Sequence, residues 1–542
     1  MPTRLWLPVL VLTLFLIACG PAAQQAPAGG AQDNQPKYGG ILNLAVDADP
    51  FDWDLSYGGR STPNQYGVSL ATNGLTRFKS GPEVEYTENI LLPDLAERWE
   101  VSSDAKTFTF HLRKGVKYQD LPPLNGREFT SADVKWTLEY RSRSGDLKEK
   151  KLPPDSSNYM FENLDRVETP DAYTAVVRFN ESFPPFLNYT ASRWNTMLPR
   201  EVYEKDGHLK DLLVGTGAYV MDTGASQKGT RWVFKKNPAY FEQGKPYIDE
   251  VRWLVMPSEA AKQAGFQTKQ IDQVDRLAYH AFQEIKRIAR QTESFKYYAT
   301  NAQQMQTSHR QGGPFADVRV RRAISMAVDR DEINRTVAGG EGLWAVPGAV
   351  AGTYSQEETR KLVRQDLEEA KRLLAEAGYN TSLEPEWLFP NNESQDNLAM
   401  YQLVQSQIKR IGVNPVLKPL DLADYRSRMR AGNFDITMSI GGTGQLNADL
   451  DSLIYKYHST SSTNYVRAKD PELDRLLEAQ RREPDAAKRQ TIIKQVQTRM
   501  LDFWPVVDTI YPPRWEAWHS HLKNYRPHYT DSSAYRHAWL EK

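Results

Sequence analysis

After residue 36 the chain continues for about 500 residues with no cysteine and no run of about eighteen uninterrupted apolar residues. A segment of this length is too long for one hydrophobic core, so we expect two or three domains. The lack of a second cysteine excludes an internal disulfide and a thiolate metal site. The lack of a long apolar run predicts that this segment does not span a membrane.

The residues before this segment have the pattern of a leader followed by a tether. Leu5–Ala18 is apolar apart from Pro8 and Thr13, and one Arg precedes it. As a helix this run would reach about 21 Å, against a hydrocarbon core of about 30 Å, which favours a secretory signal over residues 1–18. Residues 19–36, rich in Ala, Gln, Pro and Gly, have no apolar periodicity and predict a flexible tether.

The single cysteine of the chain, Cys19, stands at the junction of the two. The sequence Leu16-Ile17-Ala18-Cys19 resembles the bacterial lipobox, in which the signal is cut before a cysteine that becomes lipidated. Two or more acyl chains on Cys19 would hold the protein durably on the outer side of a membrane, and this anchor would be its only membrane contact. The alternative is an ordinary buried or spare cysteine, with cleavage at another position.

Charge and motifs exclude several classes of function. Lys plus Arg equals Asp plus Glu, at 68 each, so no global field attracts nucleic acid. The chain has no Gly-x-Ser-x-Gly, His-Glu-x-x-His or P-loop motif, so we expect no enzyme, no metal and no cofactor, although scattered side chains could still assemble a catalytic site. His519 and His521 lie at i,i+2 and could bind a metal, but a solvated strand face explains them better.

Apolar periodicity alternates between strand and helix patterns along the whole chain, which indicates α/β domains. A capped helix start is expected at Thr130, because Asp133 sits in the first turn. We predict strands at 41–46, 108–113, 230–234 and 250–255, and further helices at 366–377, 400–411 and 471–481.

Longer stretches carry a resemblance to a known family. They are LLPDLAERWEVSSDAKTFTFHLRKGVKY at 91–118, NGREFTSADVKWTLEY at 125–140, VGTGAYVM at 214–221, KKNPAYFEQGKPYIDEVRW at 235–253, PFADVRVRRAISMAVDRDEI at 314–333, DLEEAKRLLAEAGY at 366–379 and QSQIKRIGV at 405–413. In this order they resemble the extracellular solute-binding proteins of ABC importers, family 5, which include oligopeptide-, dipeptide- and nickel-binding proteins. The resemblance runs from about Gly39 to the end of the chain.

The resemblance implies an α/β, two-lobed periplasmic-binding-protein fold of the class II type with an additional subdomain, three domains in all. The first lobe is expected at 37–76, 208–298 and 508–542, the additional subdomain at 77–207 and the second lobe at 299–507. Chain crossings near residues 298 and 508 would then form the hinge, and a ligand would stabilise the closed form.

The resemblance also implies a role. A monomeric, membrane-tethered, extracytoplasmic protein would capture a peptide-like solute between its lobes. It would then deliver the solute to ABC permease subunits, which work with separate ATPases. Two alternatives stay open: an oligosaccharide-binding member of the same family, and a ligand-sensing lipoprotein that is not coupled to transport.

The expected ligand loop follows the strand pattern at 433–438. In peptide-binding relatives an aspartate in a Trp-x-x-Asp pattern pairs there with the α-ammonium group of the peptide. An ungapped placement through Asn447 puts Gln445 at that position, and a neutral amide cannot supply the same charge-assisted bond. Asp449 or Asp451 could replace it if the loop is shifted.

Other ligand-binding candidates are glycines and tryptophans. Gly442 and Gly444 would let the backbone approach a ligand closely, although a plain flexible loop explains them as well. Trp387, at the end of a strand pattern, is the first candidate for an aromatic wall, with Trp194 and Trp53 as weaker ones. A place in the hydrophobic core is the alternative for each of these rings.

Overall fold

The structure is a computed structural model that describes residues 35–50, 52–54, 62–86, 88–148, 152, 158–298, 302–347, 354–391, 393–440, 449–528 and 533–541. Cys19, Gly442, Gly444 and Gln445 lie outside these residues. Residues 37–542 form one compact unit. Within the described ranges, no helix has both the length and the apolar character needed to cross a membrane.

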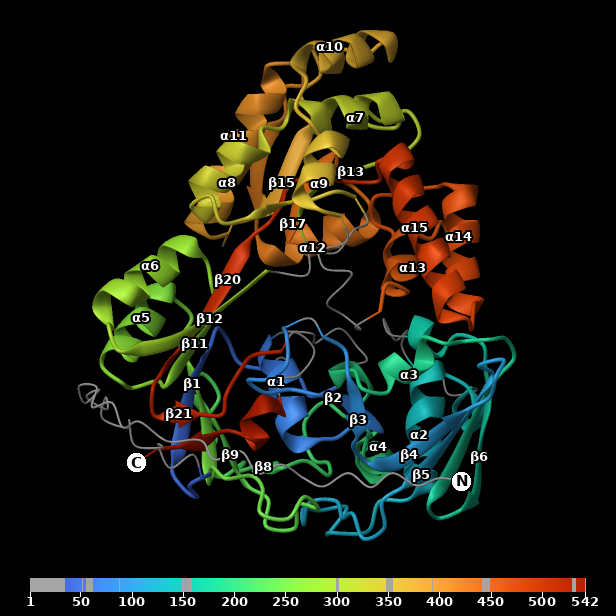
Figure 1. The fold of residues 1–542 in the computed structure, drawn as a ribbon, viewed down its shortest axis with the longest axis vertical. Helices are drawn as coiled ribbons and strands as arrows, with labels where there is room; N and C mark the ends of the chain where they lie inside the picture. Colours follow the sequence, from blue (N-terminus) through green and yellow to red (C-terminus); the bar gives the residue numbers. More distant parts are fainter. Residues whose placement is uncertain are drawn as a thin grey trace, which may run out of the picture. The chain divides into compact units, whose positions relative to one another are not determined.

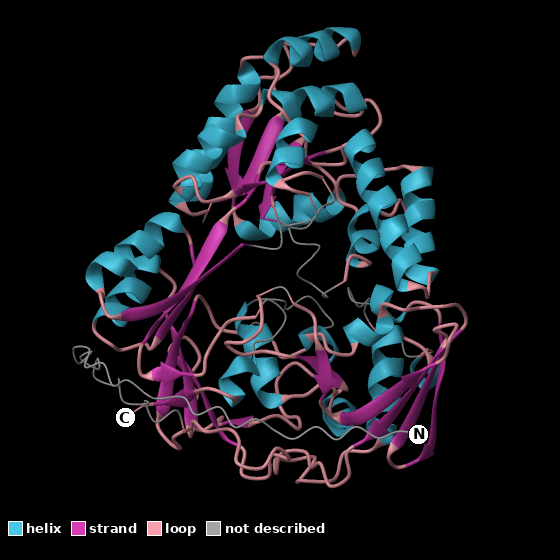
Figure 2. Cartoon of the chain, viewed as in Figure 1, coloured by secondary structure: helices cyan, strands magenta, loops and turns pink. Residues whose placement is uncertain are grey.

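The largest sheet has seven strands and draws them from distant parts of the chain (Figures 1 and 2). Its order is β12-β20-β11-β1-β10-β9-β8, and β1 runs parallel to β10 and β11. Helices α5 (Glu259–Gln267) and α6 (Tyr279–Ile288) pack beside β11. The strands are β1 (Ile41–Val46), β8 (Tyr219–Met221), β9 (Arg231–Lys236), β10 (Glu250–Val255), β11 (Gln273–Leu277), β12 (Thr292–Tyr298) and β20 (Pro513–His519).

A four-stranded antiparallel sheet lies in the segment predicted to be the additional subdomain. Its order is β4-β5-β7-β6, and α2 (Ser131–Ser142) packs on β6 and β7. The backbone N–H of Thr130 donates to Asp133 Oδ2 at 2.8 Å, so the predicted helix start is confirmed. The strands and the shorter elements nearby are β4 (Ala96–Val101), β5 (Thr107–Leu112), β6 (Leu164–Asp171), β7 (Thr174–Phe179), η2 (Asn158–Phe161), α3 (Phe186–Tyr189) and α4 (Arg200–Asp206).

A five-stranded sheet, in the order β16-β15-β17-β13-β18, separates two hydrophobic cores. Its strands are β13 (Gln303–Thr307), β15 (Glu386–Pro390), β16 (Val416–Leu420), β17 (Ile436–Ile440) and β18 (Val507–Asp508). Trp387 and Phe389 enter one core and Leu388 the other, as alternation along β15 requires.

Helices supply the other side of each core of this sheet. The core that contains Trp387 is completed by α7 (Val318–Ala327), α8 (Arg330–Ala338), α10 (Leu367–Glu376) and α11 (Gln395–Lys409). The core that contains Leu388 is completed by α12 (Leu422–Ala431), α13 (Ser452–Tyr457), α14 (Pro471–Arg482) and α15 (Ala486–Phe503).

Helix α11 starts five residues before the predicted start at residue 400. The hydroxyl of Ser394 accepts the backbone N–H of Asn397 at 3.2 Å and so caps the helix. The first turn is polar, so apolar periodicity cannot reveal it. The predicted helix at 366–377 agrees closely with α10, which begins after Asp366 and is followed by Gly378 in the left-handed region at φ +66°.

The chain passes between the seven-stranded and five-stranded sheets twice, at one place (Figure 1). Strands β12 and β20 pair antiparallel from Thr292 with His519 to Tyr298 with Pro513. After β12 the chain continues into β13 of the five-stranded sheet. It returns to β20 from that sheet through β18 and β19 (Ile510–Tyr511). The predicted division into three domains stays a prediction. Each large sheet draws its strands from one predicted domain, except that β18 includes Asp508.

Glu516 on β20 predicts a pH-dependent stability. Its side chain is buried and accepts hydrogen bonds at Oε2 from Tyr525 Oη at 2.6 Å and from Gln273 Nε2 at 2.8 Å. Burial nevertheless raises its pKa from 4.5 to about 8. Because the raised pKa favours the protonated form in the fold, this contribution to stability is complete below about pH 4.5 and is lost as the pH rises through about 8.

We therefore expect Glu516→Gln to melt at a higher temperature than the wild type at pH 9, and the difference to vanish near pH 4.5. Circular dichroism melts at several pH values measure this. Glu293→Gln, at an exposed position on the neighbouring strand β12, is the matched control and should track the wild type throughout. A Glu516→Gln curve parallel to the wild type at all pH values would contradict the assignment.

Candidate functional site

Described residues flank the expected ligand loop at both ends. Strand β17 ends at Ile440, which pairs with Gln303, and Ser439 pairs with Gln304 on β13. Strand β13 follows directly on the crossing from β12. The described chain resumes at Asp449, just before α13. Described elements therefore precede and follow the loop. The end of β17, after which the loop begins, lies beside the place where the chain crosses from β12 to β13.

The carboxylate of Asp449 is already paired. Arg489 of α15 donates to it through both Nη atoms, and Asn188 Nδ2 donates to Oδ2 at 2.9 Å. The side chain is also nearly buried, at 9% exposure. A ligand ammonium group would have to compete with Arg489 for this carboxylate. The role of Asp449 in ligand binding stays a prediction.

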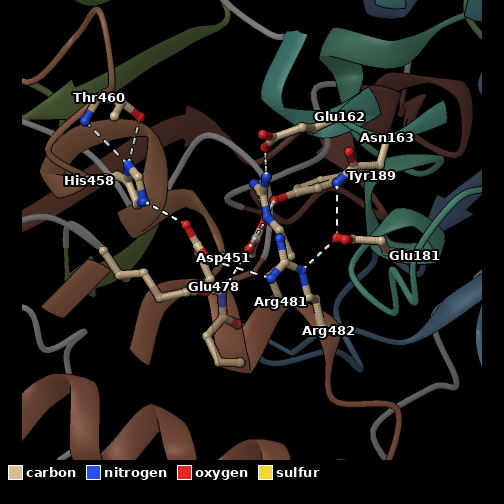
Figure 3. Close-up of polar contacts among 12 residues, drawn as sticks. Glu162, Asn163, Glu181, Tyr189, Asp451, His458, Thr460, Glu478, Arg481 and Arg482 are labelled. Atoms are coloured by element: carbon tan, nitrogen blue, oxygen red, sulfur yellow. Dashed lines mark hydrogen bonds and ion pairs between the residues drawn. The ribbon is translucent and has the colours of Figure 1, made fainter. Parts of the chain in front are cut away.

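Asp451 is the centre of a second, fully buried group of polar contacts (Figure 3). Arg481 donates from Nε to Oδ1 at 2.9 Å and from Nη2 to Oδ2 at 2.8 Å. Gln480 Nε2 donates at 2.7 Å and Tyr189 Oη at 2.6 Å. Burial would raise the pKa of Asp451, but the charge and hydrogen bonds of Arg481 outweigh it and hold the pKa below its usual value.

A half-buried ammonium group and a buried carboxyl group lie at the same end of the five-stranded sheet. Gln304 on β13 pairs in register with Asp508 on β18, and Lys456 Nζ of α13 donates to Gln304 Oε1. Burial raises the pKa of Asp508 to about 7 and lowers that of Lys456 to about 8. Asp508 Oδ1 and Tyr457 Oη have no hydrogen-bond partner within the described part of the chain. Asp508 Oδ1 can therefore accept one further hydrogen bond, and Tyr457 Oη can donate one.

Sequence reasoning missed this cluster, although a signal for it exists. Asp508 is the one acid in the apolar stretch Val506-Val507-Asp508-Thr509-Ile510, and Lys456 stands between two tyrosines. A charged residue inside an apolar strand pattern is informative because it has to be compensated when it is buried. Tyr189 and Arg481 carry no such signal, since their shared partner Asp451 is distant in sequence.

The three candidate tryptophans are buried. Trp387 is fully buried, its ring lies 6.0 Å from that of Tyr401, and its indole N–H has no hydrogen-bond partner among the described residues. Trp194 is 1% exposed. Trp53 packs edge-to-face on Trp232 at 5.6 Å and is 7% exposed. None of these rings presents an open face, which favours the core alternative for each; ligand contact by any of them stays a prediction.

His519 does not lie on a solvated strand face, so that expectation is wrong. Its ring is buried and stacks on Phe266 at 4.2 Å, and its Nε2 lies 3.0 Å from the carbonyl oxygen of Phe266. Burial lowers the pKa of His519. His521 Nε2 instead lies 2.8 Å from Asp272 Oδ1. Across the described ranges, no group of three or more His, Cys, Asp or Glu side chains is placed to hold a metal ion.

We expect Trp387→Ala to lower the free energy of unfolding by about 3–5 kcal/mol, because it removes a fully buried indole from the core. Urea denaturation of the purified protein measures this. Tyr38→Ala is the control, because that ring is 57% exposed and its loss should change stability little. If Trp387 were a ligand wall outside the core, its substitution would leave the unfolding midpoint close to that of the wild type.

Solved structures share this fold. One is that of the periplasmic binding protein AgaA in complex with agropinic acid, from A. tumefacien R10, at TM-score 0.79 and 24% identity, covering 93% of this chain and 99% of that one. Another is DppA from Helicobacter pylori in complex with the peptide STSA, at TM-score 0.79 and 20% identity, with the same coverage. The expected α/β, two-lobed periplasmic-binding-protein fold is confirmed.

Sequence comparison agrees. The chain is 27% identical over 469 residues to di/tripeptide-binding protein 1 of Pseudomonas aeruginosa (strain UCBPP-PA14), covering 81% of this chain and 84% of the relative. The model of the bacterial extracellular solute-binding proteins, family 5, middle region, matches residues 91–465. Because that match spans more than half of the chain, the protein belongs to the extracellular solute-binding proteins of family 5, which serve ABC transporters.

Proposed function

We propose that this protein captures a short peptide outside the cytoplasmic membrane and delivers it to an ABC permease. The observation that carries the proposal is the ionisable cluster at the crossing end of the five-stranded sheet, where half-buried Lys456 donates through Nζ to Gln304 and Gln304 pairs in register with the buried Asp508. A peptide has an ammonium group at one end and a carboxylate at the other, so one of its charged ends can be complemented by a member of this cluster. A relative named for di- and tripeptides and a neighbour holding the peptide STSA support this class of ligand.

An oligosaccharide is the second candidate, and the structure supports it less. Sugar binding generally relies on aromatic faces that are open to the ligand, but Trp387, Trp194 and Trp53 are all buried. The neighbouring structure of AgaA holds agropinic acid rather than a peptide. The screen should therefore include non-peptide solutes.

We expect di- to hexapeptides to raise the melting temperature and oligosaccharides to leave it unchanged. Binding at a hundredfold excess over Kd adds about 2.7 kcal/mol to the stability of the folded state. Lys456→Met should weaken peptide binding by about tenfold or more, because it removes a charged hydrogen-bond donor. Lys371→Met, at an exposed position on α10, is the matched control. Stabilisation by oligosaccharides alone would reject the peptide assignment.

The same screen tests the placement of the ligand loop. We infer that Gln445 occupies the loop position of the aspartate in peptide-binding relatives and contacts the bound peptide there, so Gln445→Ala should reduce the peptide-induced shift. If Gln445→Ala left the shift intact while Asp449→Ala abolished it, the placement would be mistaken. The basal melting temperature of Asp449→Ala has to be measured in parallel, since that substitution also leaves Arg489 without its carboxylate.

We infer further that lipidation of Cys19 tethers the protein to the membrane. The wild type should partition into the detergent phase of Triton X-114 and incorporate labelled fatty acid in cells. Cys19→Ala should do neither and should be recovered in the aqueous phase. Pro21→Ala, two residues further along the expected tether, is the control and should behave as the wild type. Equal partitioning of Cys19→Ala and the wild type would exclude this anchor.

The identity of the adjacent genes distinguishes a role in transport from a role in sensing. Permease and P-loop ATPase genes beside this one favour delivery to a transporter. An isolated gene beside a sensor kinase favours the ligand-sensing alternative. The solute should leave the purified protein chemically unchanged, because the proposed role is binding and transfer.

A further inference from the structure

We propose that residues 158–189 form a closing latch on residues 449–489, which holds the predicted additional subdomain against the predicted second lobe through polar contacts that can open and reform. The closing latch comprises Glu162, Glu181, Asn188 and Tyr189 on the first side, and Asp449, Asp451, Arg481, Arg482 and Arg489 on the second. Figure 3 shows the part of it formed by Glu162, Glu181, Tyr189, Asp451, Arg481 and Arg482. The inference rests on the proposed two-lobe function and names the contacts that control closure.

Two of the contacts across the closing latch are hydrogen bonds from neutral groups to carboxylates. Tyr189 Oη donates to Asp451 Oδ2 at 2.6 Å, and Asn188 Nδ2 donates to Asp449 Oδ2 at 2.9 Å. Both donors lie in the last two residues of α3, and both acceptors precede α13. One short helix thus reaches the two carboxylates that follow the expected ligand loop.

Two further contacts are ion pairs in which the acid lies on the first side and the arginine on the second. Glu162 pairs with Arg481, and Glu181 Oε2 lies 2.6 Å from Arg482 Nε. The guanidinium of Arg481 also lies over the ring of Phe183, 5.2 Å from its centroid. The side chain of Arg481 is only 4% exposed, whereas that of Glu162 is 56% exposed, so this ion pair joins a buried guanidinium to a carboxylate that water reaches. The second side therefore offers both carboxylates and guanidinium groups, and the first side supplies a hydrogen-bond donor or an acid for each kind.

The two sides belong to different hydrophobic cores. Phe183 and Tyr189 are part of the core that extends from the seven-stranded sheet into the four-stranded sheet. Helices α13–α15 belong to the core that contains Leu388. The half-buried ring of Tyr159 packs against both. Separation of the two sides would therefore leave each core largely intact, and mainly polar contacts would be exchanged for contacts with water.

The charges on the second side stay paired when the two sides part. Asp451 keeps Arg481 and Gln480, and Asp449 keeps both hydrogen bonds from Arg489. A buried ion that loses its only partner is strongly destabilising. Here Arg481 loses Glu162 but keeps Asp451, and Arg482 loses Glu181 but keeps Glu478 at 3.5 Å. Tyr189, Asn188, Glu162 and Glu181 would be hydrated instead. This arrangement is suited to repeated opening, and it differs from an interface that must stay closed for the protein to remain folded.

The position of the closing latch in the sequence connects it to solute recognition. Asp449 follows Gln445 by four residues, and Asp451 by six. A solute bound to the loop would therefore act on the same short segment as the hydrogen bonds from α3. Closure and solute binding are then coupled, because each favours one position of residues 449–451.

Small-angle X-ray scattering of the purified full chain, without added solute, tests the proposal. Glu162→Lys combined with Glu181→Lys places like charges opposite Arg481 and Arg482, and should increase the radius of gyration through at least a tenfold rise in the ratio of open to closed molecules. Tyr189→Phe should produce a smaller shift in the same direction, since it removes one hydroxyl and keeps the ring.

Matched controls lie inside the subdomain. Tyr173 Oη donates to Glu128 at 3.0 Å, and Glu168 pairs with Arg178 at 2.9 Å, so neither contact crosses the closing latch. Tyr173→Phe and Glu168→Lys should scatter as the wild type does, and circular dichroism establishes that every variant is folded. A double variant with the wild-type radius of gyration, or controls that expand equally, would overturn the proposal.

The scattering experiment is independent of the ligand assignment. If no peptide binds but the latch variants expand, the closing latch stands and the proposed solute is wrong. If peptides bind but the latch variants keep the wild-type dimensions, the solute assignment stands and the closing latch is rejected.

Discussion

The pairing of β12 with β20 is the constraint on which the rest of the molecule depends. Seven residue pairs, from Thr292 with His519 to Tyr298 with Pro513, tie the outgoing and returning chain into one antiparallel ladder. The residues that follow β12 become β13, and the residues that precede β20 form β18 and β19. The ladder therefore fixes where Gln304 and Asp508 meet and where the end of β17 has to lie.

Local patterns predicted most of the elements, because the evidence for them lies within one turn or one strand. Strands β1 and β10 have the predicted bounds, and α14 begins at Pro471 as expected, where a missing N–H costs nothing. The start of α11 was missed because its first turn is polar. His519 was misplaced because the i,i+2 pattern gives no information about Phe266, which buries it.

The candidate site was harder to predict than the fold, since its contacts join residues that are far apart in sequence. Asn188 reaches Asp449 across 261 residues, and Lys456 reaches Gln304 across 152. No periodicity connects such pairs. The family resemblance gave the place of the ligand loop but not the partners of Asp449 and Asp451. The sequence offers Asp449 or Asp451 as a replacement for the aspartate if the loop is shifted, but nothing in it indicates that both carboxylates are paired with arginines. The sequence could not decide whether Trp387 is buried, because a side chain at the end of a strand can face either a core or a cleft.

The place of β20 within the seven-stranded sheet has a consequence for the order of assembly. This strand lies between β12 and β11, yet it belongs to the last thirty residues or so of the chain. Until those residues emerge during synthesis or export, β11 and β12 each present an unpaired edge that invites aggregation. The five-stranded sheet and its helices, drawn from 303–508, are complete earlier. The body encoded in the middle of the chain can therefore fold first, while the one encoded at both ends has to wait for its last strand.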